Sequence, residues 1–211
     1  YQDNHYVIFD KPAGLLVIPA PDEKNCMVAV VNNQFAHNQT DHGRLYPCHR
    51  LDRDTSGAII FAYGKKCQKL MMQEFKIHKV KKKYLAFIHG YLKQKDGEIK
   101  SYISDFDQKK FRKKISPKLA ITRFRVIQMR KGFSVVEVNP ITGRTNQIRI
   151  HFSQMGHPLL GERKYAFARD YEIKFRRAAL HAHILNWIHP ITKHRIEVVS
   201  PLPEDMQNFL S

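Results

Sequence analysis

Cysteine is scarce in this sequence of 211 residues. Its three cysteines, Cys26, Cys48 and Cys67, are odd in number and widely spaced, so they form neither a disulfide framework nor a Cys-x-x-Cys zinc pair. This usage is typical of a reducing compartment, and we expect a cytoplasmic protein. The His181-x-His183 spacing places two rings on one face of a strand, but no third ligand is evident. We therefore expect no metal.

Long apolar runs and glycine-rich phosphate loops are absent too. No apolar run approaches the length of a membrane span, and no basic amphipathic helix has a clean apolar face. Asp3 and Asp10 bracket the first apolar run, which is unlike a signal peptide. Neither Gly-x-Gly-x-x-Gly nor a Walker loop occurs, so we expect no membrane partner and no nucleotide cofactor. Because the sequence starts at Tyr1, we expect the natural N-terminus to lie upstream.

Acidic residues are in deficit. Lys and Arg number 36 against 19 Asp and Glu, a net charge of +17 at pH 7. Such an excess predicts attraction to polyanions, of which nucleic acid is the commonest, while a generically basic surface is the alternative. The hydrophobic fraction of 43% and the chain length predict a globular protein with a substantial core, in one large domain or two small ones.

Apolar periodicity and turn residues predict more strands than helices, joined more often by turns than by helices. This favours an α+β fold: a single domain over residues 1–211, built on a mainly antiparallel mixed sheet with flanking helices and loops. The expected strands are Tyr6–Asp10, Leu15–Ile18, Gly57–Ala62, Tyr84–Tyr91, Ala120–Met129, Phe133–Val138, Leu180–Ile188 and Arg195–Val199. The expected helices are Met27–Phe35, Gly64–His78, Asn146–Met155 and a short one from Pro203 to Leu210.

Several local features accompany these elements. Asp96-Gly97 predicts a hairpin turn, and Thr145 is the expected cap of the helix at 146–155. Residues 105–118 predict an exposed basic loop. The four lysines of 79–83 are either a solvated helix end or, beside the aromatic strand that follows, a contact for single-stranded nucleic acid.

Residues 49–57, His-Arg-Leu-Asp-Arg-Asp-Thr-Ser-Gly, form a polar loop that leads into the apolar strand after Gly57. Four charged side chains would be costly in a core without partners, so the loop is either a solvated turn or a functional site at the mouth of a sheet. The residues alone leave both interpretations open.

Six segments, in this order, resemble the motifs of the RluA-type pseudouridine synthases, which isomerise uridine to pseudouridine in structured RNA. Alone, each match is weak; loop 49–57 followed by the Thr-Gly-Arg segment is a strong signal. The segments are 11–15 (Lys-Pro-Ala-Gly-Leu), 49–57, 83–86 (Lys-Tyr-Leu-Ala), 142–151 (Thr-Gly-Arg-Thr-Asn-Gln-Ile-Arg-Ile-His), 156–161 (Gly-His-Pro-Leu-Leu-Gly) and 180–182 (Leu-His-Ala). The chain departs from the family at Asn146, where many members have His, at Glu162, where Asp is common, and at Ala166, where Gly is common. The family often carries a small N-terminal RNA-binding domain, and this sequence starts without one.

The resemblance implies an isomerase that needs no redox step, energy source or cofactor. It makes Asp52 the essential carboxylate, which either attacks C1′ of the ribose or removes a sugar proton. It implies that Arg149 keeps that carboxylate charged, although an ordinary solvated helix arginine is the alternative. Tyr84 would stack on the uracil, and Leu180 would line the other side of the pocket.

Further residues are implied as substrate contacts. Arg50 would fill the place of the flipped base or bind a phosphate, and Lys83 and Arg144 would bind RNA, with the lysines at 79–83 and the stretch 109–118 holding its backbone. The expected partner is rRNA or tRNA, and we expect a monomer. Two alternatives are a non-catalytic RNA-binding protein with this fold and a carboxylate–metal nuclease, which would need more clustered acids.

Overall fold

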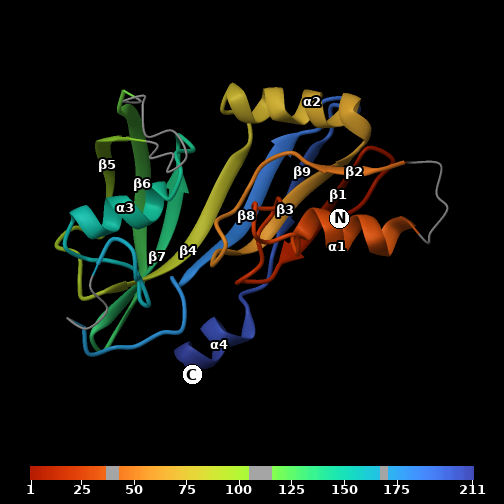
Figure 1. The fold of residues 1–211 in the computed structure, drawn as a ribbon. Coiled ribbons are helices and arrows are strands. Elements are labelled where there is room, and N and C mark those ends of the chain that lie inside the picture. Colours follow the sequence, from red (N-terminus) through yellow and green to blue (C-terminus); the bar gives the residue numbers. More distant parts are fainter. Residues whose placement is uncertain (37–42, 105–115, 167–170) are drawn as a thin grey trace. The chain divides into compact units, whose positions relative to one another are not determined.

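A computed structural model describes residues 1–36, 43–104, 116–166 and 171–211 (Figure 1). The chain divides into two compact units. Unit 1 comprises Tyr1–Tyr84 and Leu180–Ser211, and unit 2 comprises Leu85–Ala179. The division falls inside strand β4 (Lys81–His89), so that Tyr84 ends the first segment of unit 1. No helix in the described part of the chain is long and apolar enough to cross a membrane.

Unit 1 is built around β3 (Ser56–Tyr63), all of whose residues are buried. β1 pairs antiparallel with one edge of β3, and the other edge is shared by β2, which is antiparallel, and β8, which is parallel. β9 pairs antiparallel with β8. The bounds of these strands are β1 Tyr6–Lys11, β2 Leu45–Pro47, β8 Leu180–Ile188 and β9 Arg195–Val199. The helices of unit 1 are α1 Met27–Ala36, α2 Gly64–Lys76 and α4 Glu204–Leu210.

The side chains of β3 point alternately to two faces, and each face has its own apolar cluster. The α2-side cluster includes Met71 of α2, and the α1-side cluster includes Met27 and Val31 of α1. Helices therefore cover both faces, which explains why β3 reads as a continuous apolar run. The residues of β3 in the α2-side cluster are Ala58, Ile60 and Ala62, and those in the α1-side cluster are Ile59, Phe61 and Tyr63.

The parallel contact between β3 and β8 is unusually close. Ser56 lies opposite His181 and Gly57 opposite Ala182. Gly57 has a φ of +111°, and a Cβ atom there would lie 2.3 Å from the carbonyl oxygen of Ala182, so only glycine fits. A contact of 3.1 Å between Ser56 Oγ and His181 Nδ1 adds a buried hydrogen bond at the same point. Leu180, the first residue of β8, is thereby held beside the end of loop 49–57.

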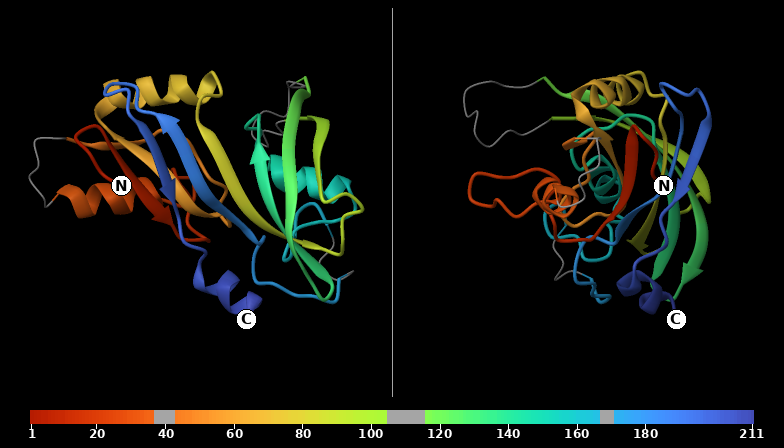
Figure 2. Two further views of the ribbon diagram at one scale, coloured as in Figure 1. Left: turned by 180° about the vertical axis from the view of Figure 1, so that it is seen from behind. Right: turned by 90° about the vertical axis from the view of Figure 1, so that its right-hand side faces the viewer.

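Unit 2 contains the strand order β4-β7-β6-β5, to which β4 contributes Leu85–His89. β5 (Asp96–Ile103) and β7 (Phe133–Pro140) both pair antiparallel with the long β6 (Lys118–Arg130). Helix α3 (Gln147–Gln154) lies across β5, β6 and β7 (Figure 2). The rings of Phe124 on β6 and Phe152 on α3 pack edge to face, with centres 5.9 Å apart.

These elements confirm the predicted α+β fold with a mainly antiparallel mixed sheet. The pairs β1–β3, β2–β3, β5–β6, β6–β7 and β8–β9 are antiparallel, whereas β3–β8 is parallel. The helices and most of the strands lie within a few residues of their expected bounds. The extent of the domain, residues 1–211, stays a prediction.

Four local predictions are wrong. Leu15–Ile18 is not a strand: it makes one bridge, between Leu16 and Cys26, because Pro19 and Pro21 prevent a longer ladder. Asp96-Gly97 begins β5, and the chain turns just before it. The lysines after residue 80 are not a helix end, since β4 already starts at Lys81.

The fourth wrong prediction concerns the cap of α3, which is Asn146 in the left-handed conformation (φ 55°) and not Thr145. Asparagine tolerates this conformation better than most residues. The basic loop expected at 105–118 lies outside the described residues up to position 115, and its last residue, Lys118, begins β6.

Candidate active site

Loop 49–55 directs its apolar and charged side chains in different directions. Leu51 is 5% exposed and belongs to the α1-side cluster of unit 1, whereas Arg50 and Arg53 are exposed. Asp52 is half-buried between them, and its carbonyl accepts a hydrogen bond from the Thr55 amide at 3.1 Å. The loop is therefore a turn anchored by one leucine, which keeps Asp52 at the edge of the core.

The turn 11–15 holds the backbone next to Asp52. Lys11 is 1% exposed, and its Nζ donates to the carbonyl oxygens of Pro12, Leu15 and Arg53 at 2.7, 2.7 and 2.9 Å. The amide of Gly14 also donates to the Arg53 carbonyl, at 2.9 Å. A buried ammonium is tolerated here because carbonyl oxygens surround it. From the sequence, we treated Lys11 only as part of a turn and missed its role as a buried donor to three carbonyl oxygens. The sequence feature that could have indicated this role is a lysine at the end of an apolar strand.

Tyr84 lies on the same side of unit 1 as Leu51, packed against the α1-side cluster. Burial raises the pKa of its phenol, and the negative charge of Asp52 raises the pKa further. The two side chains therefore lie within electrostatic reach of each other, and the phenol stays protonated at neutral pH. The structure thus brings together Asp52 and Tyr84, which the sequence placed in separate motifs.

The remaining expected contacts of unit 1 differ in exposure. Leu180 is 3% exposed at the start of β8. Lys83 is half-buried on β4, next to Tyr84 in the chain. Arg50 is exposed on the loop, so it is accessible to a polyanion. Their roles as substrate contacts stay predictions.

Arg149 belongs to unit 2 and has a carboxylate partner there. Its Nε and Nη2 donate to the two oxygens of Glu162 at 2.7 and 2.8 Å, and its Nη1 donates to Asn146 Oδ1 at 3.1 Å. The Arg149 side chain is 11% exposed, so the alternative of an ordinary solvated helix arginine is wrong. A bidentate pair of this kind fixes both the position and the plane of a guanidinium.

Glu162 and Tyr165 complete the surroundings of Arg149. The Glu162 side chain is 1% exposed, and its Oε1 also accepts the amides of Arg163, Lys164 and Tyr165. Burial alone would raise the pKa of this carboxyl, but hydrogen bonds and charge from Arg149, with the backbone amides, bring the pKa below its ordinary value. The Arg149 guanidinium lies 5.5 Å from the centre of the Tyr165 ring, a cation–π contact.

Sequence reasoning missed this partner of Arg149 and recorded Glu162 only as a departure from the family's pattern. The available signal is an acid directly after Leu159, Leu160 and Gly161, because an acid that follows buried residues requires a partner.

Arg144 lies in the turn before α3. Its Nε donates to the Leu119 carbonyl at 3.3 Å, and its amide donates to Gln147 Oε1 at 3.0 Å. Gln147 Oε1 also accepts the Thr142 hydroxyl at 2.6 Å, while its Nε2 donates to the Ile121 carbonyl at 2.9 Å. These bonds join the 142–147 segment to β6, which is a structural role; RNA binding by Arg144 stays a prediction.

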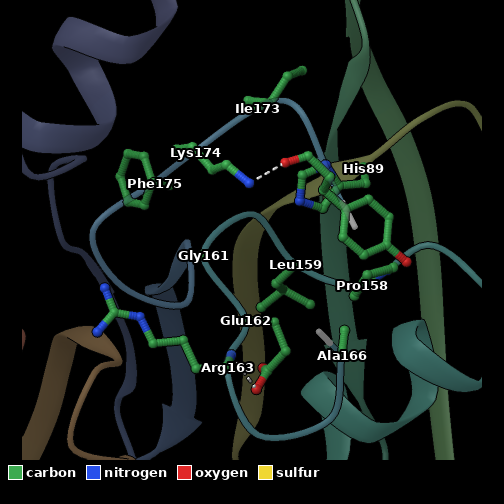
Figure 3. Close-up of a pocket in the computed structure, with 11 residues that line it drawn as sticks. His89, Pro158, Leu159, Gly161, Glu162, Arg163, Ala166, Ile173, Lys174 and Phe175 are labelled. Carbon is green, nitrogen blue, oxygen red and sulfur yellow. Dashed lines mark hydrogen bonds between the residues drawn. The ribbon is translucent and has the colours of Figure 1, made fainter. Parts of the chain in front are cut away.

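A pocket of unit 2 lies next to Glu162 (Figure 3). One wall is the His89 ring stacked on Tyr171, with ring centres 4.1 Å apart. Lys174 Nζ donates to the Tyr171 carbonyl at 2.5 Å, and burial followed by the charge of Lys174 lowers the pKa of His89 to about 4. In this wall, Tyr171 thus contacts both His89 and Lys174. Because the lowered pKa keeps His89 neutral at pH 7, Lys174 is the charged member of these three residues.

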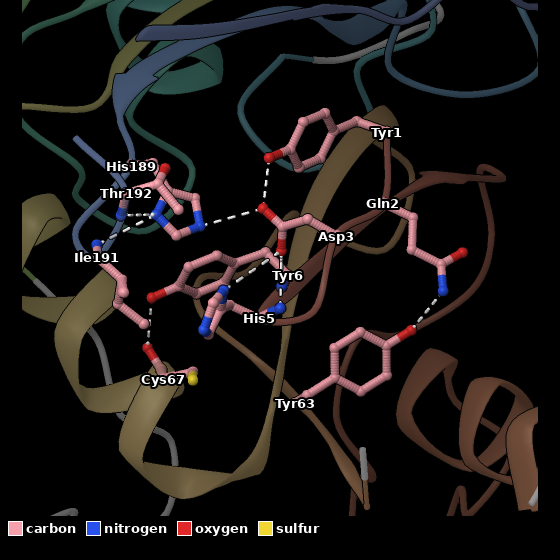
Figure 4. A network of polar contacts seen from close by, with 10 residues as sticks. All are labelled: Tyr1, Gln2, Asp3, His5, Tyr6, Tyr63, Cys67, His189, Ile191 and Thr192. Atoms are coloured by element: carbon pink, nitrogen blue, oxygen red, sulfur yellow. Dashed lines mark hydrogen bonds and ion pairs between the residues drawn. The ribbon is translucent and has the colours of Figure 1, made fainter. Parts of the chain in front are cut away.

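The described residues contain one cluster with the composition of a metal site, Asp3, His5 and His189 in unit 1 (Figure 4). His189 Nε2 lies 3.1 Å from an Asp3 oxygen. However, His189 Nδ1 accepts the amides of Ile191 and Thr192 at 3.1 and 2.9 Å, so the ring proton is on Nε2. A protonated Nε2 has no lone pair for a metal. These residues fit an Asp–His contact between two chain segments and do not fit a metal site.

A half-buried carboxylate within electrostatic reach of a phenol, just before a buried strand, is compatible with nucleophilic or acid–base chemistry. Comparison with known proteins identifies the family. The sequence matches the family model described as RNA pseudouridylate synthase over residues 5–154. It is 35% identical over 216 residues to YhcT of Bacillus subtilis (strain 168), named an uncharacterized RNA pseudouridine synthase, covering 99% of this chain and 70% of that protein.

One further relative supports the assignment, and one solved structure shows the same fold. The dual-specificity RNA pseudouridine synthase RluA of Haemophilus influenzae is 33% identical over 198 residues, 91% of this chain and 87% of that protein. The structure titled Human RNA Pseudouridylate Synthase Domain Containing 4 has the same fold, with a TM-score of 0.83, 24% identity, and coverage of 100% of this chain and 90% of that one. The chain belongs to the RNA pseudouridylate synthase family, of the RluA type, whose members are isomerases.

Proposed function

We propose that this protein converts specific uridines of structured rRNA or tRNA to pseudouridine, with Asp52 as the essential carboxylate. Named relatives include a dual-specificity RNA pseudouridine synthase and a tRNA pseudouridine synthase, which supports RNA as the substrate. The net charge of +17 also favours a polyanionic substrate. The few, scattered cysteines support a cytoplasmic location. The monomeric state stays a prediction.

The reaction rearranges one nucleotide without an added reagent. The N1–C1′ bond breaks, the uracil turns, C5 bonds to C1′, the C5 hydrogen leaves as a proton and N1 gains one. Asp52 starts this sequence by attacking C1′ or by removing a sugar proton, and both routes need an ionised carboxylate near the ribose. A base within folded RNA must first leave its stack, and Arg50, exposed on the same loop, is suited to occupy the vacated position.

The proposed role of Tyr84 follows from its burial and its pKa. Because the phenol stays protonated at neutral pH, it serves better as a stacking surface and hydrogen-bond donor than as a base. Leu180 supplies an apolar wall of the uracil site, and Lys83 and Arg144 contact phosphates. For Arg149 we keep the catalytic role that the family implies, supported by the bidentate bonds that fix its guanidinium.

The observation that carries the proposal is the position of Asp52, which adjoins Leu51 on the side of unit 1 where Tyr84 packs and lies within electrostatic reach of its phenol. A protein that only bound RNA would need cations and stacking surfaces, and a half-buried carboxylate would repel the polyanion. A non-catalytic RNA-binding protein with this fold is therefore the second candidate, favoured only by the excess of basic residues.

The test compares wild type with Asp52→Asn on an unmodified transfer RNA transcript labelled with tritium at uridine C5. Because C5 loses its hydrogen when it bonds to C1′, released tritium counts product directly. We expect Asp52→Asn to lower the rate at least 1,000-fold while RNA affinity changes less than threefold. Ribosomal RNA transcripts form a second arm, since the two substrate classes are both included in the proposal.

Glu23→Gln is the matched control, because Glu23 is an acid that forms an ion pair with Arg53, which lies on the same loop as Asp52. It changes the net charge by the same amount as Asp52→Asn, and we expect its rate to stay within threefold of wild type. Full activity of Asp52→Asn would exclude Asp52 as the catalytic group. Absence of tritium release by the wild type from both RNA classes would support the second candidate.

A further inference from the structure

Three lysines form a stripe along the exposed side of α2. Lys65, Lys69 and Lys76 are separated by four and seven residues, spacings that place side chains on one face of a helix, and all three are exposed. At about 1.5 Å per residue, the stripe is roughly 16 Å long. We call it the α2 lysine stripe. The opposite side of α2 carries Met71, which is fully buried in the α2-side cluster.

The α2 lysine stripe has no acidic partner among the described residues of the protein, so its charge is available to an external anion. Within the part of the chain that the structure describes, none of its three lysines forms an ion pair. Three basic residues exposed on strands β5 and β6 of unit 2 do have such partners. Lys100 and Arg123 each lie 2.8 Å from Glu98, and Arg125 lies 3.2 Å from Glu137.

The arrangement of the stripe is also unfavourable for the helix itself. Lys65 and Lys69 are like charges one turn apart, which repel each other. Lys65 lies in the first turn of α2, at the positive end of the helix dipole, and that turn contains no acidic residue. A bound polyanion would remove both unfavourable interactions.

We propose that the α2 lysine stripe binds the phosphate backbone of the RNA substrate, at a part of the RNA other than the reacting uridine. The stripe lies on the α2 side of the unit 1 sheet, whereas Leu51 and Tyr84 pack on the α1 side. It is thus a second contact surface, separate from the candidate active site. This inference rests on the proposed function, since it takes RNA as the substrate.

RNA is a better occupant than a membrane surface. A helix that lies on a membrane inserts an apolar face into the lipid. The apolar face of α2 is already used, because Met71 is buried and Cys67 and Phe75 pack against the α2-side cluster. Outward, α2 presents the three lysines, with the half-exposed Met72 between Lys69 and Lys76, and their positive charges match a chain of phosphates.

The test removes the stripe with the triple variant Lys65→Gln, Lys69→Gln and Lys76→Gln. The matched control removes the same charge from ion-paired positions of unit 2 with Lys100→Gln, Arg123→Gln and Arg125→Gln. Affinity for an unmodified transfer RNA transcript is measured over a series of KCl concentrations. For the stripe variant, we expect the slope of log affinity against log salt to become shallower by about 2 to 3, since each lost phosphate contact removes roughly 0.7 to 0.9.

We also expect the stripe variant to lose at least tenfold in affinity at 100 mM KCl, and the control variant to lose less than threefold. The thermal midpoint of the stripe variant should equal or exceed that of wild type, because its substitutions remove repulsion between lysines. Such a midpoint excludes unfolding as the cause of the lost affinity. An unchanged slope for the stripe variant, or an equal change in the control variant, overturns the proposal.

Two further arms test a membrane surface and the proposed function one at a time. Vesicles of phosphatidylglycerol and phosphatidylcholine test the membrane: vesicle binding that needs the stripe, with RNA binding unchanged, overturns the proposal. Tritium release by the wild type tests the proposed function. If the wild type releases tritium but the salt slope of the stripe variant is unchanged, only the stripe proposal is refuted. If the stripe variant has the shallower slope but the wild type releases no tritium, RNA binding by the stripe is supported and only the enzymatic function is refuted.

Discussion

The two units hold Asp52 and Arg149, the charged residues proposed for the reaction, by different means. In unit 1, a backbone carbonyl positions the loop of Asp52. The carbonyl oxygen of Arg53 accepts hydrogen bonds from both Lys11 Nζ and the Gly14 amide. In unit 2, side chains hold Arg149, through the carboxylate of Glu162 and the amide oxygen of Asn146.

This difference predicts which substitutions each unit tolerates. A loop held through its backbone keeps its shape when exposed side chains such as Arg53 change, because the hydrogen-bonded atoms remain. A guanidinium held by side chains depends on the identity of its partners. We therefore expect the largest effects in unit 2 at Glu162, and in unit 1 at Lys11.

Glu162→Ala should have the largest effect on stability. It leaves a nearly buried guanidinium without its carboxylate and three amides without an acceptor. Breaking a buried ion pair from one side costs about 3–5 kcal/mol. Urea denaturation measures the loss, and Glu162→Gln, which keeps an acceptor, should lose less. Equal stability of Glu162→Ala and wild type would contradict the role given to this pair.

Lys11→Met should come next, at about 2–3 kcal/mol, because three carbonyl oxygens lose the buried donor that they share. Methionine retains most of the buried volume, so the loss reports hydrogen bonding rather than packing. We expect tritium release to fall at least tenfold, since the Arg53 carbonyl adjoins Asp52. Activity that survives in full while stability falls would show that the loop is held without Lys11.

Acid should destabilise both units through histidines kept neutral. Burial, then the charge of Lys82, lowers the pKa of His49 to about 3, and burial, then Lys174, lowers the pKa of His89 to about 4. The unfolded chain binds these protons near pH 6.5, so stability is complete above that pH and falls as pH decreases toward 4. In addition, His49 Nε2 accepts the Ile60 amide, a bond that protonation breaks.

The measurement is the free energy of unfolding between pH 4 and 7.5. His49→Gln and His89→Gln should each reduce the acid slope, by at most about 1.4 kcal/mol per pH unit. If only one of them changes the slope, only that histidine's unit loses stability through histidine protonation. A slope that neither substitution changes would mean that other groups cause the acid sensitivity.

Arg53→Gln should have the smallest effect. The Arg53 side chain is 50% exposed, and it pairs with Glu23 on the surface. Exposed pairs contribute about 0–1 kcal/mol, so we expect a loss below 1 kcal/mol and a rate within threefold of wild type. A larger loss of activity would mean that side chains, and not only the backbone, shape the Asp52 loop.

The elements of the fold were largely predictable because burial leaves a periodic record in a sequence. The run after Gly57 predicted β3, and the spacing of Cys67, Met71 and Phe75 predicted α2. Leu15–Ile18 failed because short apolar stretches between prolines lack the partners that a strand needs. Thr145 failed because the cap depends on a left-handed residue, and local sequence does not specify which of two neighbours adopts that conformation.

The sequence by itself determined the family, the strand and helix pattern, the basic charge and the residues available for chemistry. Only the tertiary structure showed that Tyr84 lies within reach of Asp52, that Lys11 is buried among carbonyl oxygens and that Glu162 is the carboxylate that holds Arg149. The reason is physical: periodicity records which side faces a core, whereas a hydrogen bond between distant residues depends on how the chain returns to meet itself.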